Sequence, residues 1–267
     1  MIRCFLTVLA LAAMLASACG PASAQSDAGK TAASPGQRAG GEAGAQNADT
    51  GEEPDPGVRD YDNQGKQYLR NGQFDEAVSE FAKALEANPA DADAYLGRGR
   101  ARYRKNEYNR ALDDFSKAIE LNHNLAGAYF SRGLAWRAKG EFEKAVADYT
   151  EAIALRPDFA AAYLQRGVAW EDLKSYDRAL TDYTAAIGLK GDLADAYFFR
   201  GLVFLNTLSD ADRAAGDFSK AIELDPRNAK AYCGRSFAWA AMGDTDKAKA
   251  DAAKAKQIDP SVIVPKF

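Results

Sequence analysis

The residues that most suggest chemistry are five arginines, each in the middle of an otherwise apolar stretch. In "AYFSRGLAW", residues 128–136, Arg132 falls on the same side of a helix as Tyr129, Gly133 and Trp136, because these positions are three or four residues apart. An isolated guanidinium would be strongly unfavourable on a buried face, so each arginine either binds a ligand or forms half of an ion pair. The corresponding residues elsewhere are Arg98, Arg166, Arg200 and Arg235.

An acidic residue follows each arginine after sixteen residues, or after seventeen in one case. In an antiparallel helical hairpin that turns midway between them, the two positions lie level, so a guanidinium and a carboxylate can form a bidentate pair. We therefore predict a structural ladder of arginine-acid pairs within the hairpins. The alternatives are a row of arginines presented to a ligand, and pairing with the acid of the preceding hairpin. The predicted acidic partners are Asp114, Asp148, Asp182, Asp217 and Asp251.

Other chemically active residue types are isolated in this sequence. The single histidine, His123, has no neighbours that could complete a catalytic or metal site, and Cys233 has no dedicated basic neighbour that would activate its thiol. The sequence contains no Gly-rich phosphate-binding loop, no nucleophile turn and no zinc-type clustering of Cys and His. We expect a protein that is not an enzyme and needs neither a cofactor nor a metal ion.

The charge balance argues against a nucleic-acid partner. The 267 residues carry 34 Lys and Arg against 38 Asp and Glu, which gives a formal net charge of -4. Neutralising phosphates requires a surplus of basic residues on one surface, so we expect no binding to nucleic acid.

Residues 1–24 are typical of an export signal, with Arg3, an apolar run and then small residues. Two processing sites compete. The segment "PASAQ" predicts cleavage after Ala24 and a mature chain that starts at Gln25 in the periplasm or outside the cell. The segment "ASAC" resembles a lipoprotein box, in which Cys19 would be acylated and would anchor the protein to a membrane, although Ala16 stands where such boxes usually carry Leu.

Residues 25–57 contain no large apolar side chain. Such a segment cannot bury enough apolar surface to offset the entropy of ordering it, so we predict a disordered linker.

The rest of the chain repeats with a period of 34 residues and one extra residue in the fifth copy. Each copy contains two amphipathic helical stripes, separated in most copies by a residue that ends a helix easily, such as Asn106 or Gly140. Each copy is thus predicted to be two antiparallel helices. The copies span 58–91, 92–125, 126–159, 160–193, 194–228 and 229–262, and a tail, 263–267, follows.

This arrangement of Tyr, Gly, Ala and Pro at fixed positions of the period resembles the tetratricopeptide repeat (TPR) family. The resemblance implies an all-α fold, a right-handed α-solenoid of six helix-turn-helix repeats. His123 and Gly191 replace the proline that ends most copies, and Arg102 replaces an aromatic residue. Lys249 and Lys256 stand where earlier copies are apolar, which predicts that the sixth copy ends the array.

In the TPR family the first helices line a concave groove that binds peptides or helices, and the resemblance implies such a groove here. It is basic toward the N-terminal side and apolar further along. Some of the apolar surface should be available, because the adjacent Phe198 and Phe199 cannot both face one neighbouring helix; the alternative is that several of these residues pack against the next first helix. The implied groove residues are Arg100, Arg104, Phe130, Leu134, Arg137, Leu164, Val168, Phe198, Phe199, Leu202, Leu205 and Phe237.

These observations favour a non-enzymatic scaffold that holds a peptide or helix of a partner protein outside the cytoplasm. The alternative is a pilotin-like outer-membrane assembly lipoprotein acylated at Cys19, and only that form would contact a membrane. Self-association through the same concave face is a further possibility. The sequence does not identify the partner.

Overall fold

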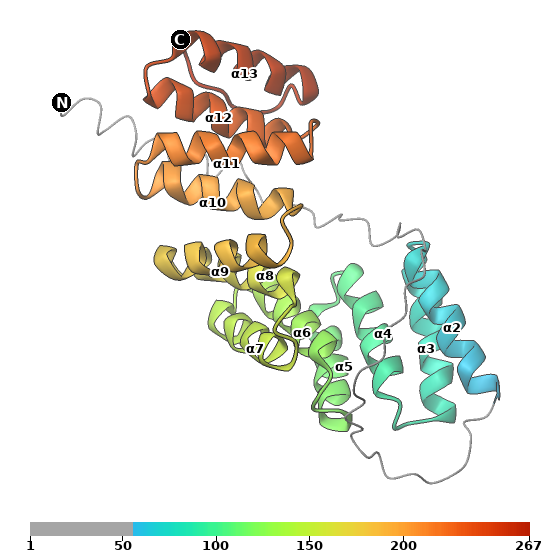
Figure 1. The fold of residues 1–267 in the computed structure, drawn as a ribbon. Helices are drawn as coiled ribbons and strands as arrows, with labels where there is room; N and C mark the ends of the chain where they lie inside the picture. Colours follow the sequence, from blue (N-terminus) through green and yellow to red (C-terminus); the bar gives the residue numbers. More distant parts are fainter. Residues whose placement is uncertain (1–55) are drawn as a thin grey trace, which may run out of the picture.

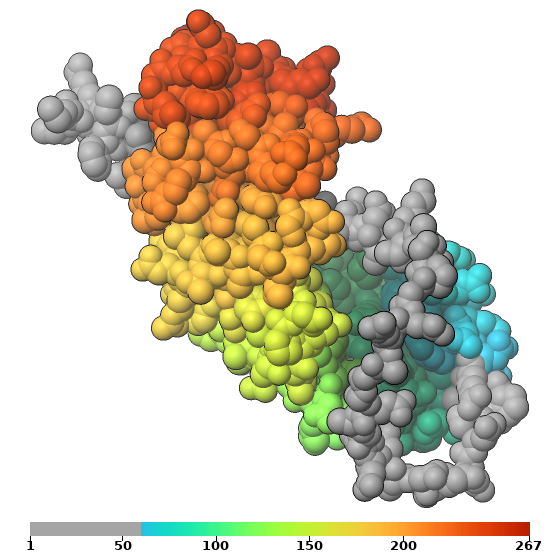
Figure 2. Space-filling view, in the orientation of Figure 1, coloured from blue at the N-terminus to red at the C-terminus, as the bar shows by residue number. Residues whose placement is uncertain are grey.

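The computed structural model describes residues 56–267 as an array of helices that follow one another in chain order from one end of the molecule to the other (Figure 1, Figure 2). Within these residues the chain forms twelve helices and no strand, which confirms the predicted all-α solenoid. The predicted export signal, Cys19 and nearly all of the predicted linker lie outside this range. The helices are α2 (Pro56–Arg70), α3 (Phe74–Ala87), α4 (Ala92–Arg104), α5 (Tyr108–Leu121), α6 (Ala126–Ala138), α7 (Phe142–Leu155), α8 (Ala160–Asp172), α9 (Tyr176–Leu189), α10 (Ala194–Asn206), α11 (Ala211–Leu224), α12 (Ala229–Ala241) and α13 (Thr245–Ile258).

Consecutive helices pair as hairpins, which we number as units one to six, from α2 with α3 to α12 with α13. In every unit one residue of the turn adopts a positive φ, which glycine tolerates without steric cost. Gly140 has φ 79° and Asn106 has φ 62°, as the helix-ending pattern indicates. Lys174 and Ser209 adopt the same conformation in units four and five, and nothing in their residue types signals it.

The core of units one to five is an aromatic ring that projects from the second helix onto a glycine of the first helix. A methyl group at Gly133 would lie 2.7 Å from the ring of Tyr149, so the two helices can approach this closely only because glycine has no side chain. The rings are fully buried. They belong to Phe81, Phe115, Tyr149, Tyr183 and Phe218.

The first helices of the units lie on the inner side of the array. Successive first helices contact one another, as α2 does with α4 and α4 with α6, whereas the second helices pack mainly on first helices. Elements on the inside of a curved array lie closer together than those on the outside, so the first helices line the concave face. Contact between consecutive units is least extensive between units four and five. There α9 contacts α10 less than the corresponding helices do at other junctions, and α8 and α10 make little contact.

The predicted arginines form ion pairs with the acids of their own hairpins in units two to six. The closest nitrogen-oxygen distances are 2.7–2.8 Å, and both carboxylate oxygens accept hydrogen bonds from the same guanidinium. The aspartate side chains are only 3–10% exposed. The pairs are Arg98 with Asp114, Arg132 with Asp148, Arg166 with Asp182, Arg200 with Asp217 and Arg235 with Asp251.

From unit three onward, the arginine of each pair also donates a hydrogen bond to a hydroxyl group of the preceding unit. The acid of the preceding unit, which was the alternative partner, is not involved. Arg132 Nη1 donates a hydrogen bond to Ser116 Oγ of α5 at 3.2 Å, and Arg166 Nη1 donates to Thr150 Oγ1 of α7 at 3.1 Å. The same contact recurs in Arg200 with Thr184 and Arg235 with Ser219. One guanidinium therefore fixes the register within a hairpin and between two units.

Burial of these pairs has an energetic cost. Loss of solvation raises the pKa of Asp148 although Arg132 pulls it in the opposite direction, and hydrogen bonding to Asp148 raises the pKa of Arg132. The pair thus mainly fixes the register of the two helices. When one partner is lost, the charge of the other is left buried and uncompensated, which is strongly unfavourable.

Units one and two depart from the regular ladder. In unit two, Arg102 Nη1 forms a second ion pair with Asp114 at 2.8 Å, which explains why an arginine stands at the aromatic position. In unit one, Gln64 stands at the arginine position and donates to Asp60 at 2.9 Å, while Glu80 pairs with Lys83 at 2.8 Å.

The C-terminal segment after α13 packs back onto the last unit. Val262 and Val264 are partly buried against the cluster that contains Phe237, and the Sγ of the buried Cys233 lies 2.8 Å from the carbonyl oxygen of Ile263. An extended strap thus covers part of α12, while Lys249 and Lys256 on α13 are exposed.

Removing one partner of a ladder pair should destabilise the protein more than removing both. Arg132→Met leaves Asp148 buried without its cation, so we expect the free energy of unfolding to fall by roughly 3 kcal/mol. Arg132→Met/Asp148→Leu should recover part of that loss, because no uncompensated charge remains. Urea unfolding followed by circular dichroism measures both. A double variant as unstable as the single one would contradict this account.

Glycines at the ring contacts should not tolerate a methyl group. We expect Gly133→Ala to lower the free energy of unfolding by about 1–3 kcal/mol, because Tyr149 must move. The matched control is Gly216→Ala in α11, where a new Cβ meets nothing within 4 Å. That change should raise the free energy of unfolding by about 0.5–1 kcal/mol, because alanine favours helix. Similar effects of both substitutions in urea unfolding would argue against a steric role for Gly133.

Candidate functional site

The inner face of the first helices is less open than the resemblance implies. Five of the apolar residues assigned to the groove are buried, with exposed fractions of 5–8%. The curvature of the array brings these side chains against neighbouring helices, so they are core residues and the assignment of an open apolar groove to them is wrong. They are Leu164, Val168, Phe198, Leu205 and Phe237.

The argument from adjacent phenylalanines also fails, because the two rings enter the core on different sides. The Phe198 ring lies 5.9 Å from the ring of Phe218 in its own hairpin, while the Phe199 ring stacks on Tyr183 of the preceding unit at 6.0 Å. The two rings also contact each other edge to face at 5.4 Å. Adjacent residues on a helix can therefore both be covered when helices pack on two sides.

The remaining groove residues keep some access to solvent. Phe130, Leu134, Phe199 and Leu202 are half-buried, and Arg100 and Arg104 are exposed. Arg104 lies over the ring of Phe74 at 4.9 Å. Arg100 donates a hydrogen bond to Ser131 Oγ at 3.3 Å.

A group of polar side chains lies where the first and second helices of units three and four meet, and we call it the central polar cluster: Arg137, Tyr149, Glu171, Asp172 and Tyr183. The Nε of Arg137 on α6 donates to Asp172 Oδ2 on α8 at 2.9 Å, which joins the two units. Within unit four, the hydroxyl of Tyr183 on α9 donates to Glu171 Oε2 on α8. The hydroxyl of Tyr149 on α7 is buried and finds no hydrogen-bond partner among the described residues.

Burial sets the unusual proton affinities in this cluster. Desolvation raises the pKa of Glu171 from 4.5 to about 7, although the Tyr183 hydrogen bond and the charges of Arg137 and Lys174 oppose the shift. Desolvation also raises the pKa of Tyr183 and Tyr149, which stay neutral at physiological pH. Perturbed groups of this kind concentrate at functional sites.

Sequence reasoning identified only Arg137 of this cluster. Tyr149 and Tyr183 occupy the core aromatic position that holds Phe in units one, two and five. The change from Phe to Tyr was the feature of the sequence that could have indicated a polar group in this part of the core. Glu171 takes the groove position that Arg137 takes one unit earlier, which is a second signal. The ladder arginines, in contrast, are engaged by their aspartates and do not form a site.

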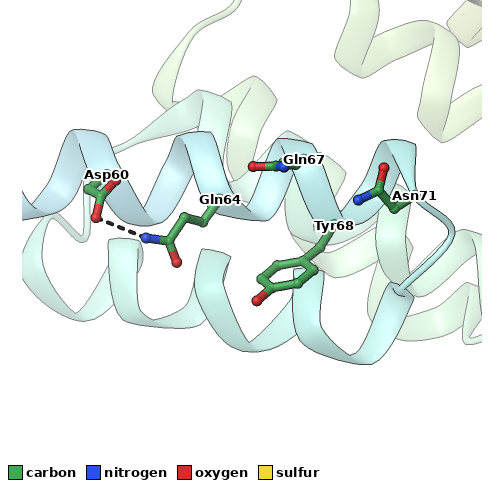
Figure 3. Close-up of a pocket in the computed structure, with 5 residues that line it drawn as sticks. All are labelled: Asp60, Gln64, Gln67, Tyr68 and Asn71. Carbon is green, nitrogen blue, oxygen red and sulfur yellow. Dashed lines mark hydrogen bonds between the residues drawn. The ribbon is translucent and has the colours of Figure 1, made fainter.

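Outside the central polar cluster, the remaining candidates among the described residues are His123 and one surface hollow. His123 is exposed in the turn between α5 and α6. No three His, Cys, Asp or Glu side chains in residues 56–267 are placed to hold a metal ion, and none of the described helices could span a membrane. A hollow of about 420 Å³ is lined only by α2 and the residue that follows it, whereas ligand sites usually draw on several elements (Figure 3). Its residues are Asp60, Gln64, Gln67, Tyr68 and Asn71.

The shifted carboxyl should make stability depend on pH. The folded protein binds the Glu171 proton more tightly than the unfolded chain does, so this stabilisation is complete below pH 4.5 and is lost as the pH rises to about 7. The shift corresponds to roughly 3 kcal/mol. Urea unfolding at several pH values should show a smaller loss for Glu171→Gln than for the wild type, while Glu86→Gln, at an exposed site on α3, keeps the wild-type loss. Equal losses in all three proteins would contradict the burial of Glu171.

Comparisons with known proteins agree with this architecture. A family model described as tetratricopeptide repeat matches residues 63–126 and 176–229, and a model described as TPR repeat matches residues 133–174. No curated protein is significantly similar in sequence.

Several solved structures share the fold. MamA is 28% identical with a TM-score of 0.56, over 62% of this chain and 96% of MamA. YrrB, described as a TPR protein with an unusual peptide-binding site, is 26% identical with a TM-score of 0.56, over 67% of this chain and 92% of YrrB. Pseudomonas aeruginosa pilF has a TM-score of 0.70 at 19% identity, over 77% of this chain and 93% of pilF, and shows similarity of fold alone. With its repeats, its helical hairpins and these matches, the chain belongs to the tetratricopeptide repeat family.

Proposed function

We propose that this protein is a non-enzymatic scaffold that holds a segment of a partner protein on the inner face of its first helices. The observation that carries the proposal is the incomplete cover of that face. Phe130, Leu134 and Leu202 remain half-buried on α6 and α10, and Arg100 and Arg104 are exposed on α4. Apolar side chains bordered by charged ones suit an extended or helical segment with apolar anchors. The peptide-binding site of YrrB, a protein of the same fold, supports this function.

The proposed place of action is outside the cytoplasm. The support is the sequence of residues 1–24, which is typical of an export signal. The expected mature chain begins at Gln25 and is not lipidated. Intact-mass measurement of the protein purified from its own cell distinguishes this product from one that begins at an acylated Cys19. The acylated product would instead support the pilotin-like lipoprotein.

Substitutions on the inner face should abolish partner capture without unfolding the protein. We expect Leu134→Asp and Leu202→Asp to reduce recovery of the partner from envelope extracts about tenfold or more, because a charge replaces an apolar anchor. The matched control is Leu189→Asp, since Leu189 is 45% exposed at the end of α9. Circular dichroism melting confirms that each variant is folded. Unchanged recovery with both folded inner-face variants would refute the groove.

A further inference from the structure

Two arginines near α6 have no acidic partner, and the following proposal rests on the groove function above. Arg100 lies on α4, and Arg156 directly follows α7. Both side chains are exposed, and neither forms an ion pair with an acid among the described residues, whereas each ladder arginine is engaged by an aspartate. Two positive charges are therefore left for a group outside the chain.

The two arginines belong to one surface, because direct contacts connect both of them to α6. Arg100 Nε donates a hydrogen bond to Ser131 Oγ of α6 at 3.3 Å. The ring of the neighbouring Phe130 packs on Phe159, with ring centroids 4.8 Å apart, and the guanidinium of Arg156 lies 3.3 Å from the centroid of the Phe159 ring. We call Arg100, Phe130, Arg156 and Phe159 the arginine-phenylalanine patch.

The position of Arg100 depends on a glycine of α6. A Cβ at Gly127 would lie only 3.2 Å from Arg100 Nη2, so a larger residue there would push the guanidinium aside. Every other copy carries a side chain at the corresponding position, namely Arg59, Asp93, Ala161, Asp195 or Lys230. Unit three thus makes room for an arginine of unit two.

Arg156 departs from a structural rule of the array. At the corresponding position of four other copies, an Asn or Asp side chain accepts a hydrogen bond from the backbone two residues later, as Asn122 Oδ1 does from the N–H of Asn124 at 3.0 Å. The four are Asn88, Asn122, Asp225 and Asp259. Arg156 cannot accept this bond and lies on Phe159 instead. A residue that breaks a local rule in this way points to a role in binding.

We propose that the arginine-phenylalanine patch binds an acidic stretch of the partner segment, in which carboxylates pair with Arg100 and Arg156 and a neighbouring apolar side chain packs on Phe130. A guanidinium can hold a carboxylate through two parallel hydrogen bonds. Phe130 and Phe159 are half-buried, so apolar surface is available in the same patch. A basic segment would be repelled by both arginines.

The carboxylates come from acidic side chains rather than from the end of a chain. Arg104, one helical turn after Arg100 on α4, is also exposed and forms no ion pair among the described residues. Three guanidinium groups without an acid suit a segment with several carboxylates, whereas a chain terminus supplies one. Because these charges are exposed, we expect binding to weaken as the salt concentration rises.

The test begins with random peptides of about twelve residues displayed on phage and selected on the full chain at low salt. The tightest binder is synthesised with both termini blocked, together with versions in which each Asp is replaced by Asn and each Glu by Gln. Calorimetry then gives Kd for the wild type, Arg156→Gln and the matched control Arg227→Gln, which removes an exposed arginine without an ion pair from the turn between α11 and α12.

The expected result is that one acidic residue of the peptide contributes about tenfold to the affinity of the wild type and the control, and about twofold or less to that of Arg156→Gln. A binder without acidic residues, or equal contributions in all three proteins, overturns the proposal. Loss of binding when the C-terminus of the peptide is blocked also overturns it, because the ligand would then be a terminal carboxylate.

Gly127→Ala provides a second readout that a merely structural role would not give. Alanine favours helix, so the melting temperature should not fall, while the displaced Arg100 should weaken the peptide about threefold or more. A variant that binds as tightly as the wild type overturns the role of Arg100.

Failure of this proposal is distinguishable from failure of the groove. Peptides that are lost with Leu134→Asp or Leu202→Asp, but whose acidic residues contribute equally to binding by the wild type and Arg156→Gln, would overturn the patch and leave the groove in place. If no peptide is selected, or if binding survives both leucine substitutions, the groove and the patch both fall.

Discussion

The buried arginine-aspartate pair is the interaction on which the rest of the array depends. In units three to six one guanidinium is held by both oxygens of a carboxylate in its own hairpin and by a hydroxyl of the preceding unit, as Arg132 is by Asp148 and Ser116. The pair fixes how the two helices of a hairpin slide against each other and how each unit meets the previous one. It contributes specificity of register more than net stability, because desolvation offsets most of its attraction.

This register determines what the inner face can present. With the helices of each hairpin held in register, the rings of Tyr149 and Tyr183 are fully buried against the first helices, and the hydroxyl of Tyr183 donates a hydrogen bond to Glu171. A partly protonated carboxyl and an unpartnered hydroxyl are both unfavourable in an isolated fold. Groups that lower stability in this way are expected mainly at functional sites.

The repeat and the pairing could be predicted from sequence because they depend on fixed intervals, and the arginine-acid interval of sixteen residues is set by hairpin geometry. The open groove could not be predicted, because the exposure of Leu164, Val168 and Phe198 depends on how sharply successive first helices curve together. Glu171 was missed because its meaning comes from Tyr183, which lies on another helix and reads as core in the sequence. Contacts set by a fixed spacing within one repeat can thus be predicted from sequence. Contacts that depend on the curvature of the array, or on a residue that differs from the other repeats at its position, cannot.

In this account the half-buried carboxyl of Glu171 is desolvated and is held by the neutral hydroxyl of Tyr183, with no ion pair among the described residues. Its most direct test is the carbon-13 chemical shift of the Glu171 side-chain carboxyl as a function of pH in the free, folded protein. The account predicts a titration midpoint near 7, well above the ordinary value of 4.5. A midpoint near 4.5 would contradict it, because it would show that the carboxyl is already solvated or paired.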